Sequence, residues 1–241
     1  MNIVYLQCDM RFNSYLMEKI GSKKVIEHTI SRINLLNADK VIAAVYDCGK
    51  NVSLIDTLKE NNVEIVLSKE NDVNVRFLNT VKMYDVDYVV RVGGDQVLLD
   101  YEITNHILQR MNETKEEFFY NPYSACIIPD IVSMGCIKKY WNELIHANRY
   151  FQTLLSKKEI KKYCGTELPY VLYDFRVNSN EGLRICKNVI QNRLNVYVLS
   201  KKLALKLIQK DNYLNRTGLL SSWIIGSTSC DFFYDEEKKI N

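Results

Sequence analysis

The fold is decided by one stretch of the sequence, Asp87-Tyr88-Val89-Val90-Arg91-Val92-Gly93-Gly94-Asp95. Valine and tyrosine run almost without interruption through its first half, which is typical of a strand buried in the middle of a parallel sheet. Two glycines and an aspartate follow, so we expect the strand to end in a tight turn that presents a carboxylate. Ligands of open parallel sheets bind beyond the carboxyl ends of the strands, and the turn is therefore a candidate binding site.

Strands and helices are predicted to alternate on both sides of this stretch. The sequence predicts strands over 2–7, 40–46, 63–67, 87–92, 117–120, 126–133 and 194–199, and helices over 23–36, 53–61, 71–84, 101–111, 137–155 and 201–209. The aromatic tail from Asn212 onward has no clean period, and no element is assigned to it. This order predicts a single α/β domain with three layers, helices covering both faces of a mostly parallel, mixed sheet.

The composition excludes several classes of protein. Of the 241 residues 47% are hydrophobic and 25% charged, which is ordinary for a globular chain. The net charge of +3 comes without a long basic block, so no nucleic-acid partner is expected. Seven cysteines without a C-x-x-C pair, beside three histidines, indicate reduced thiols rather than a zinc site. No signal peptide or membrane span is recognisable, and the sequence predicts a cytoplasmic protein.

Asp95 has two interpretations on the residues alone. A carboxylate that follows a buried strand on a Gly-Gly turn is suited to hold a hard cation against phosphate oxygens. The glycines could equally serve only the turn, with Asp95 capping the next helix. Both interpretations stay open at this point. Cys8, at the end of the first strand, has no histidine pattern beside it and is interpreted as a small buried hydrophobe rather than a nucleophile.

Three stretches resemble one family, the cytidylyltransferases of the spore-coat-polysaccharide type, relatives of the CMP-sugar synthetases. Residues 89–100 are similar to its Val-Arg-x-Thr-Gly-Asp-x-Pro-Leu-x-Asp, residues 23–28 to its Lys-Pro-Leu-Ile-Glu-His, and residues 72–77 to its Asp-Val-Leu-Asp-Arg-Phe/Tyr. Their order and spacing fit over about residues 1–140. The resemblance implies a GT-A-like nucleotide-diphospho-sugar transferase fold, with a nucleotide-binding part over 1–140 and a divergent C-terminal part over 141–241 of one domain.

The resemblance also implies an activity, namely transfer of CMP from CTP to a sugar or to a sugar or polyol phosphate, with release of pyrophosphate, in surface polysaccharide or glycoconjugate synthesis. It implies Mg²⁺, with Mn²⁺ as the alternative, and it allows a homodimer. The residues implied are Asp95 as metal ligand and catalytic residue; Arg11 as catalytic cation; Gln7, Cys8, Asp9, Met10, Arg11, Asp72, Arg76, Gly93, Gly94 and Gln96 around the nucleotide; and Asp130 at the acceptor sugar.

Two departures from the family pattern bear on activity. The family's phosphate loop, Gln-Ala-Arg-Met-Gly-Ser-Thr-Arg-Leu-Pro-Gly-Lys, is shortened here to residues 7–15: Asp9 replaces the first arginine and Tyr15 falls where the lysine belongs. Lys19 or Lys23 could replace that lysine. Late in the chain, the family's Leu-Arg-Leu-Thr-Leu-Asp-Thr-Pro-Glu-Asp has its best sequence counterpart at 194–203, which puts Leu199 in place of a metal-binding aspartate.

These departures leave two alternatives to the cytidylyltransferase. One is a catalytically degenerate relative that serves as a nucleotide- or sugar-binding or partner subunit. The other is a GT-A glycosyltransferase, although the usual Asp-x-Asp is replaced by Asp95-Gln96-Val97. The loop over 7–20 should discriminate between catalysis and degeneracy, because Tyr15 filling the phosphate site would favour the degenerate relative.

Overall fold

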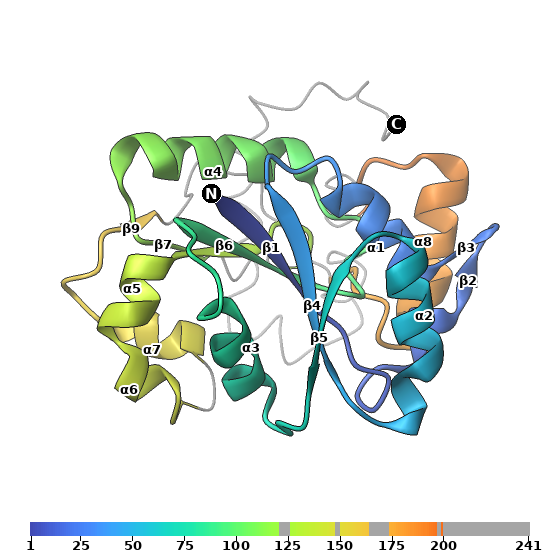
Figure 1. The fold of residues 1–241 in the computed structure, drawn as a ribbon. Coiled ribbons are helices and arrows are strands. Elements are labelled where there is room, and N and C mark those ends of the chain that lie inside the picture. Colours follow the sequence, from blue (N-terminus) through green and yellow to red (C-terminus); the bar gives the residue numbers. More distant parts are fainter. Residues whose placement is uncertain (121–125, 148–149, 164–173, 197–198, 200–241) are drawn as a thin grey trace, which may run out of the picture.

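The computed structural model describes residues 1–120, 126–147, 150–163, 174–196 and 199 (Figure 1). Within them a seven-stranded sheet has the order β5-β4-β1-β6-β8-β7-β9, and a separate hairpin pairs β2 with β3. The main strands are β1 (Asn2–Gln7), β4 (Lys40–Tyr46), β5 (Glu64–Ser68), β6 (Tyr88–Gly93), β7 (Phe118–Phe119), β8 (Asp130–Ser133) and β9 (Lys162–Tyr163), and the hairpin strands are β2 (Lys19–Ile20) and β3 (Lys23–Lys24).

The four strands β5, β4, β1 and β6 are parallel, and β8 runs antiparallel to both β6 and β7. The register pairs Gln7 with Gly93 at the carboxyl ends of β1 and β6. The two central strands therefore end side by side, and the loop after β1 meets the Gly-Gly turn after β6.

Helices cover both faces of the sheet (Figure 1), and each face has its own apolar core. One core is closed by α1, α2, α4 and α8, and the other by α3, α5, α6 and α7. The helices are α1 (Val25–Ile33), α2 (Val52–Glu60), α3 (Val73–Val81), α4 (Tyr101–Thr114), α5 (Met134–Lys139), α6 (Trp141–Leu144), α7 (Tyr150–Ser156) and α8 (Asn180–Asn192), with short 3-10 helices η1 (Ser14–Met17) and η2 (Gly49–Asn51). The predicted three-layer α/β fold with a mixed sheet is confirmed.

Local sequence explains where the site-forming helices begin. Asp72 accepts hydrogen bonds from the backbone N–H of Asn74 (2.7 Å) and Val75 (3.0 Å) and so caps α3. Ser179 caps α8 by accepting from the N–H of Gly182 at 3.1 Å. Each cap satisfies N–H groups that the first turn of a helix leaves without partners. Both caps lie where the chain approaches the carboxyl edge of the sheet.

Two predicted elements were wrong. The helix predicted over 137–155 is instead divided into α5, α6 and α7. Tyr140, at φ −106° and ψ 17°, interrupts the helical backbone between α5 and α6; its ring is buried in the second core and its hydroxyl donates to Glu159. At 194–196 and 199, the described residues of the strand predicted over 194–199, the chain does not pair as a strand. The N–H of Leu199 donates to the carbonyl of Asn195, as in a helical turn, and its side chain packs on the first core.

Two other features complete the fold. The strand predicted over 126–133 is shorter than expected, since only Asp130–Ser133 pairs. The helix predicted over 201–209 and the tail from Asn212 lie outside the described residues. Among the residues that are described, no helix has the length and apolar character needed to cross a membrane.

Candidate functional site at the carboxyl edge of the sheet

The Gly-Gly turn holds the end of β6 against β1. The N–H of Gly94 donates to the carbonyl of Gln7 at 2.8 Å, and the N–H of Gly93 donates to the side-chain oxygen of Gln96 at 2.5 Å. A Cβ on Gly94 would lie 2.9 Å from Cδ1 of Ile26 and 3.0 Å from Cβ of Cys8. Glycine is therefore required here by close packing. Cys8 is buried, and burial raises the pKa of its thiol to about 12, which supports its role as a packing residue.

Asp95 is the carboxylate that this turn presents. Burial raises the pKa of Asp95 above its ordinary value, and the positive charge of Arg176 opposes that effect. The amide of Asn13, from the loop after β1, donates to Oδ2 of Asp95 at 3.3 Å and to the carbonyl of Val177 at 3.0 Å. Asn13 thus ties together three segments far apart in sequence. A partly desolvated carboxylate is suited to gain a cation.

The segment 174–178, which leads into α8, forms the other side of Asp95. The N–H of Val177 donates to the backbone carbonyl of Asp95 at 3.1 Å. Phe175 and Val177 are buried, whereas Asp174, Arg176 and Asn178 are exposed, as expected for an extended segment with one face on the core. Three polar residues therefore lie on the open side of the segment that contacts Asp95.

The segment before α8 offers a second counterpart of the late family motif. Leu199, the counterpart of the aspartate in the alignment at 194–203, packs on the first core. The segment that reaches Asp95 directly before a capped helix is Val177-Asn178-Ser179-Asn180-Glu181-Gly182, which is similar to the Leu-Asp-Thr-Pro-Glu-Asp part of the motif with Asn178 at the first aspartate. Two features of the sequence indicate helix α8: Ser179 is a favoured N-cap residue, and apolar residues recur at helical spacing from Leu183 to Val189.

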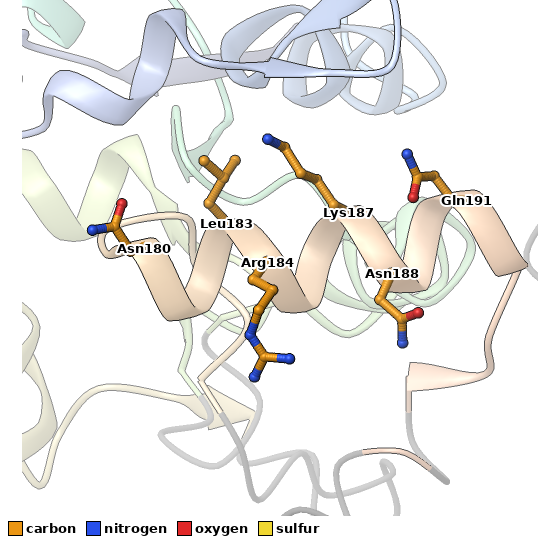
Figure 2. Close-up of a pocket in the computed structure, with 6 residues that line it drawn as sticks. All are labelled: Asn180, Leu183, Arg184, Lys187, Asn188 and Gln191. Carbon is orange, nitrogen blue, oxygen red and sulfur yellow. The ribbon is translucent and has the colours of Figure 1, made fainter.

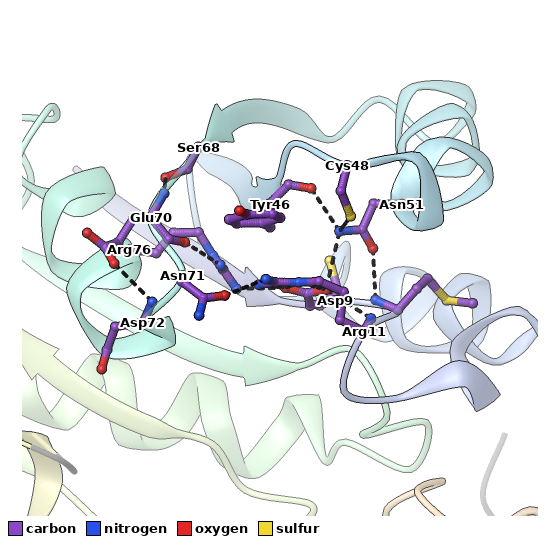
Figure 3. A network of polar contacts seen from close by, with 12 residues as sticks. Asp9, Arg11, Tyr46, Cys48, Asn51, Ser68, Glu70, Asn71, Asp72 and Arg76 are labelled. Carbon is purple, nitrogen blue, oxygen red and sulfur yellow. Dashed lines mark hydrogen bonds and ion pairs between the residues drawn. The ribbon is translucent and has the colours of Figure 1, made fainter.

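The loop after β1 is organised around Asp9, whose side chain is 5% exposed (Figure 3). Oδ2 of Asp9 lies 2.7 Å from Nη2 of Arg11 and 3.1 Å from Nη2 of Arg76, and the amide of Asn51 donates to Oδ1 at 3.2 Å. Burial alone would raise the pKa of Asp9, but hydrogen bonds from Arg11 and Asn51 outweigh it and lower the pKa below its ordinary value. The replacement of the family's arginine by Asp9 thus creates a buried ion-pair network.

Arg11 is fully engaged in this network. Its Nε and Nη2 donate to Asp9, its Nη1 donates to Asn71 at 2.5 Å, and its guanidinium lies 3.7 Å from the ring centroid of Tyr46. Arg76 is 1% exposed and donates from Nη1 to the carbonyl of Glu70 at 2.8 Å. Asn51 holds the loop further, because it accepts from the N–H of Met10 at 2.8 Å.

A second polar row crosses the sheet on the α3 side. The register aligns Tyr5, Arg91 and Asp130 on β1, β6 and β8. Arg91 donates from Nε and Nη2 to the side-chain oxygen of Gln7, at 2.9 and 2.5 Å, and its Nη1 lies 3.8 Å from Asp130. Burial raises the pKa of Asp130, and Arg91 opposes it. Oδ2 of Asp130 is buried without a hydrogen-bond partner among the described residues.

The predicted site residues therefore fall into groups. Two groups meet at the ends of β1 and β6: Gln7, Cys8, Gly93, Gly94, Asp95 and Gln96 at the turn, and Asp9, Met10, Arg11 and Arg76 in the adjoining network. Asp130 lies one strand away, linked through Arg91, and Asp72 serves as the cap of α3. Sequence reasoning missed Asn13, Asn51, Asp174 and Arg176, which complete these groups.

The groups around Asp95 suit a cation that is held partly by the protein and partly by substrate phosphates and water, rather than one that the protein encloses fully. No group of three or more histidine, cysteine or acidic side chains suited to a metal occurs in the described part of the chain. Mg²⁺ is commonly held by one or two carboxylates together with substrate phosphates and water. Asp95, a single carboxylate directly after β6, fits that pattern.

A pocket of about 340 Å³ lies elsewhere, along α8 (Figure 2). Leu183, Lys187 and Gln191 point to one side of the helix, and Arg184 and Asn188 to the other. None of the predicted site residues lines it. Its lining residues are Asn180, Leu183, Arg184, Lys187, Asn188 and Gln191.

Solved structures share this architecture. A cytidylyltransferase from Leptospira borgpetersenii superposes with a TM-score of 0.69 at 18% identity, covering 87% of this chain and 94% of that one. A CMP:2-keto-3-deoxy-manno-octonic acid synthetase, complexed with CTP, superposes with a TM-score of 0.56 at 10% identity, covering 80% and 99%. At such identities the likeness concerns the fold alone.

The sequence itself gives the family. The model of the family described as Cytidylyltransferase matches residues 10–169, which is more than half of the chain. The protein belongs to the cytidylyltransferase family, and this membership supports a nucleotidyltransferase enzyme. An uncharacterized protein of Methanocaldococcus jannaschii, MJ1063, is 22% identical over 135 residues, 54% of this chain. The chain spans about half the length of that curated relative, 55% of it.

Proposed function

We propose that this protein transfers CMP from CTP to an anionic oxygen of a sugar or of a sugar or polyol phosphate, in the synthesis of surface polysaccharide or a glycoconjugate. The acceptor oxygen forms a bond to the α-phosphorus while the bond from that phosphorus to the bridging oxygen breaks, and pyrophosphate leaves. Family membership supports nucleotidyl transfer. The observation that carries the proposal is the half-buried Asp95 at the carboxyl end of β6, between the loop after β1 and the segment before α8.

In this proposal the side chains act by position and charge, which supply most of the catalysis in phosphoryl-group chemistry. Asp95 would hold Mg²⁺, or Mn²⁺, which would supply positive charge to neutralise the phosphate oxygens. The backbone over Gln7–Met10 lines the nucleotide site, and the buried side chains of Arg76 and Gln96 hold the loop and the turn around it. Asp130 faces the acceptor, and the Arg91 contacts to Gln7 and Asp130 couple the acceptor side to the nucleotide side. Arg11 can contact a phosphate only if it gives up its hydrogen bonds to Asp9 or Asn71.

The test is pyrophosphate release from CTP, UTP, ATP and GTP with Mg²⁺ or Mn²⁺ and a panel of sugar acids and sugar phosphates. We expect turnover with CTP, and Asp95→Asn should lower it at least about 100-fold because a charged metal ligand is lost. The matched control is Asp87→Asn, at the opposite end of β6 on the surface, which should leave turnover unchanged. Turnover retained by Asp95→Asn would contradict the role of Asp95.

One observation favours a second candidate, a relative that binds nucleotide without turnover. The shortened loop is held by Asp9, Arg11 and Arg76 in a closed network rather than around an open phosphate cradle. A Mg²⁺-dependent thermal shift with CTP, without pyrophosphate release on any acceptor of the panel, would support that candidate. A shift with UDP and Mn²⁺ instead would indicate glycosyl transfer.

A further inference from the structure

The shortened loop leaves the charge of a triphosphate without an obvious partner. Arg11 uses all three guanidinium nitrogens in contacts with Asp9 and Asn71, and its side chain is 18% exposed. Arg76 is buried against Asp9 and Glu70. Lys23, on the hairpin, donates from Nζ to Ser31 at 3.0 Å. A phosphate could recruit Arg11 or Arg76 only by opening a buried ion pair, which is costly.

The chain builds a second unit with the same local geometry on the other side of Asp95. In Asp9-Met10-Arg11 and in Asp174-Phe175-Arg176, the N–H of the arginine donates to Oδ1 of the aspartate at 3.0 Å. In both, Nε of the arginine contacts both carboxylate oxygens and Nη2 contacts Oδ2. The second unit differs in exposure, since the side chains of Asp174 and Arg176 are 48% and 47% exposed.

Arg176 also has donors to spare. Its Nη1 has no hydrogen-bond partner among the described residues, whereas Nη1 of Arg11 is bonded to Asn71. Asp174 pairs with the edge of the guanidinium formed by Nε and Nη2, and the edge that includes Nη1 is left for another partner. Val177, the next residue, donates its N–H to the carbonyl of Asp95, so the arginine is anchored beside the proposed metal ligand. A held guanidinium loses little conformational entropy when it pairs with an oxyanion.

We propose that Arg176 binds the β- and γ-phosphates of the nucleotide and neutralises the leaving pyrophosphate, in place of the cations that the shortened loop lacks. Asp174 is its positioning residue. The assignment rests on the proposed function, because it requires a metal-bound triphosphate at Asp95. Arginine suits the task, because its planar fork of donors pairs two phosphate oxygens at once. Arg11 and Arg76 then keep the loop in shape.

The test compares ligands that differ only in their phosphates. Binding of CTP, CMP and inorganic pyrophosphate, each with Mg²⁺, is measured calorimetrically for the intact protein. Arg176→Gln should weaken CTP and pyrophosphate about 10-fold or more, as expected for the loss of a charged hydrogen bond, and leave CMP unchanged. Arg176→Lys should recover part of the loss. Arg184→Gln, which removes the same charge from the exposed side of α8, is the control and should change nothing.

The outcomes separate the two claims. If the wild-type protein binds CTP more tightly than CMP and Arg176→Gln retains that difference, the assignment of Arg176 is overturned while the proposed function stands. Equal weakening of CTP and CMP would also overturn it, since the arginine would then act on the fold of the segment. If the wild-type protein binds neither CTP nor pyrophosphate, the proposed function and this assignment fail together.

Discussion

The two Asp-x-Arg units on either side of Asp95 share one geometry and differ in surroundings. In the first, Asp9 is buried and receives Arg11, Arg76 and Asn51. In the second, Asp174 and Arg176 are half-exposed and pair with each other. A buried pair that loses one partner leaves an uncompensated charge, whereas an exposed pair exchanges its partner for water or an anion at little cost. The comparison teaches that the same local motif stabilises the fold where it is buried and can bind a ligand where it is exposed.

The largest expected effect breaks the first unit. Asp9→Asn leaves Arg76 buried without a carboxylate, and we expect a loss of about 3–5 kcal/mol in the free energy of unfolding. The matched change in the second unit, Asp174→Asn, should cost only about 0–1 kcal/mol. Urea unfolding of the three proteins measures both values. Equal losses would show that burial does not distinguish the units.

A middle-sized effect concerns the turn between them. Gly94→Ala places a Cβ within 3.0 Å of Ile26 and Cys8, and such overpacking costs about 1–3 kcal/mol. Gly49→Ala is the control, because no atom lies within 4 Å of its new Cβ. Thermal unfolding should separate the two variants clearly. A Gly94→Ala protein as stable as the wild type would show that Ile26 and Cys8 move aside for the new Cβ at no cost.

The smallest expected effect concerns how steeply the free energy of unfolding falls as the pH is lowered in the acid range. The pKa of Asp9 is lowered in the folded state, so its contribution to stability is full above the unfolded pKa of about 3.9 and is lost as the pH falls through the lower folded value. The pKa of Asp174 is lowered too, and exposure reduces what that contributes. We expect Asp9→Asn to flatten the fall of stability below about pH 4 more than Asp174→Asn does, as measured by urea unfolding at a series of pH values.

Much of the fold could be predicted from the sequence, because the period of the apolar residues is clear in the first part. The strands at 2–7 and 40–46 end where predicted, and the valine run before Gly93 is central in the sheet. Prediction failed where tertiary contacts override a local period. Leu194, Val196 and Val198 alternate as in a strand, whereas Val196 and Leu199 are spaced as in a helical turn, and only packing on the first core decides between the two.

The site was predictable where it is local. The turn at 93–96 and the loop after β1 are continuous in sequence, so glycine and charge mark them. Asn13, Asn51 and Arg176 could not be found in that way, because their roles come from contacts with residues 40 or more positions away or with another loop. Asp9, which replaces the family's first arginine, puts a negative charge into the loop that is expected to bind phosphate. In the structure two arginines and an amide neutralise it.

The hydrogen bond from Asn13 to the carbonyl of Val177 spans 164 positions of the chain. Contacts between residues so far apart in sequence form late, because a long loop must close before they gain anything. During synthesis the parallel strands β1, β4, β5 and β6 are all complete before residue 174 emerges. We therefore expect the central sheet to assemble first and the Asp174–Arg176 segment to dock last. Amide hydrogen exchange should accordingly be faster in this segment than in the strands beneath it.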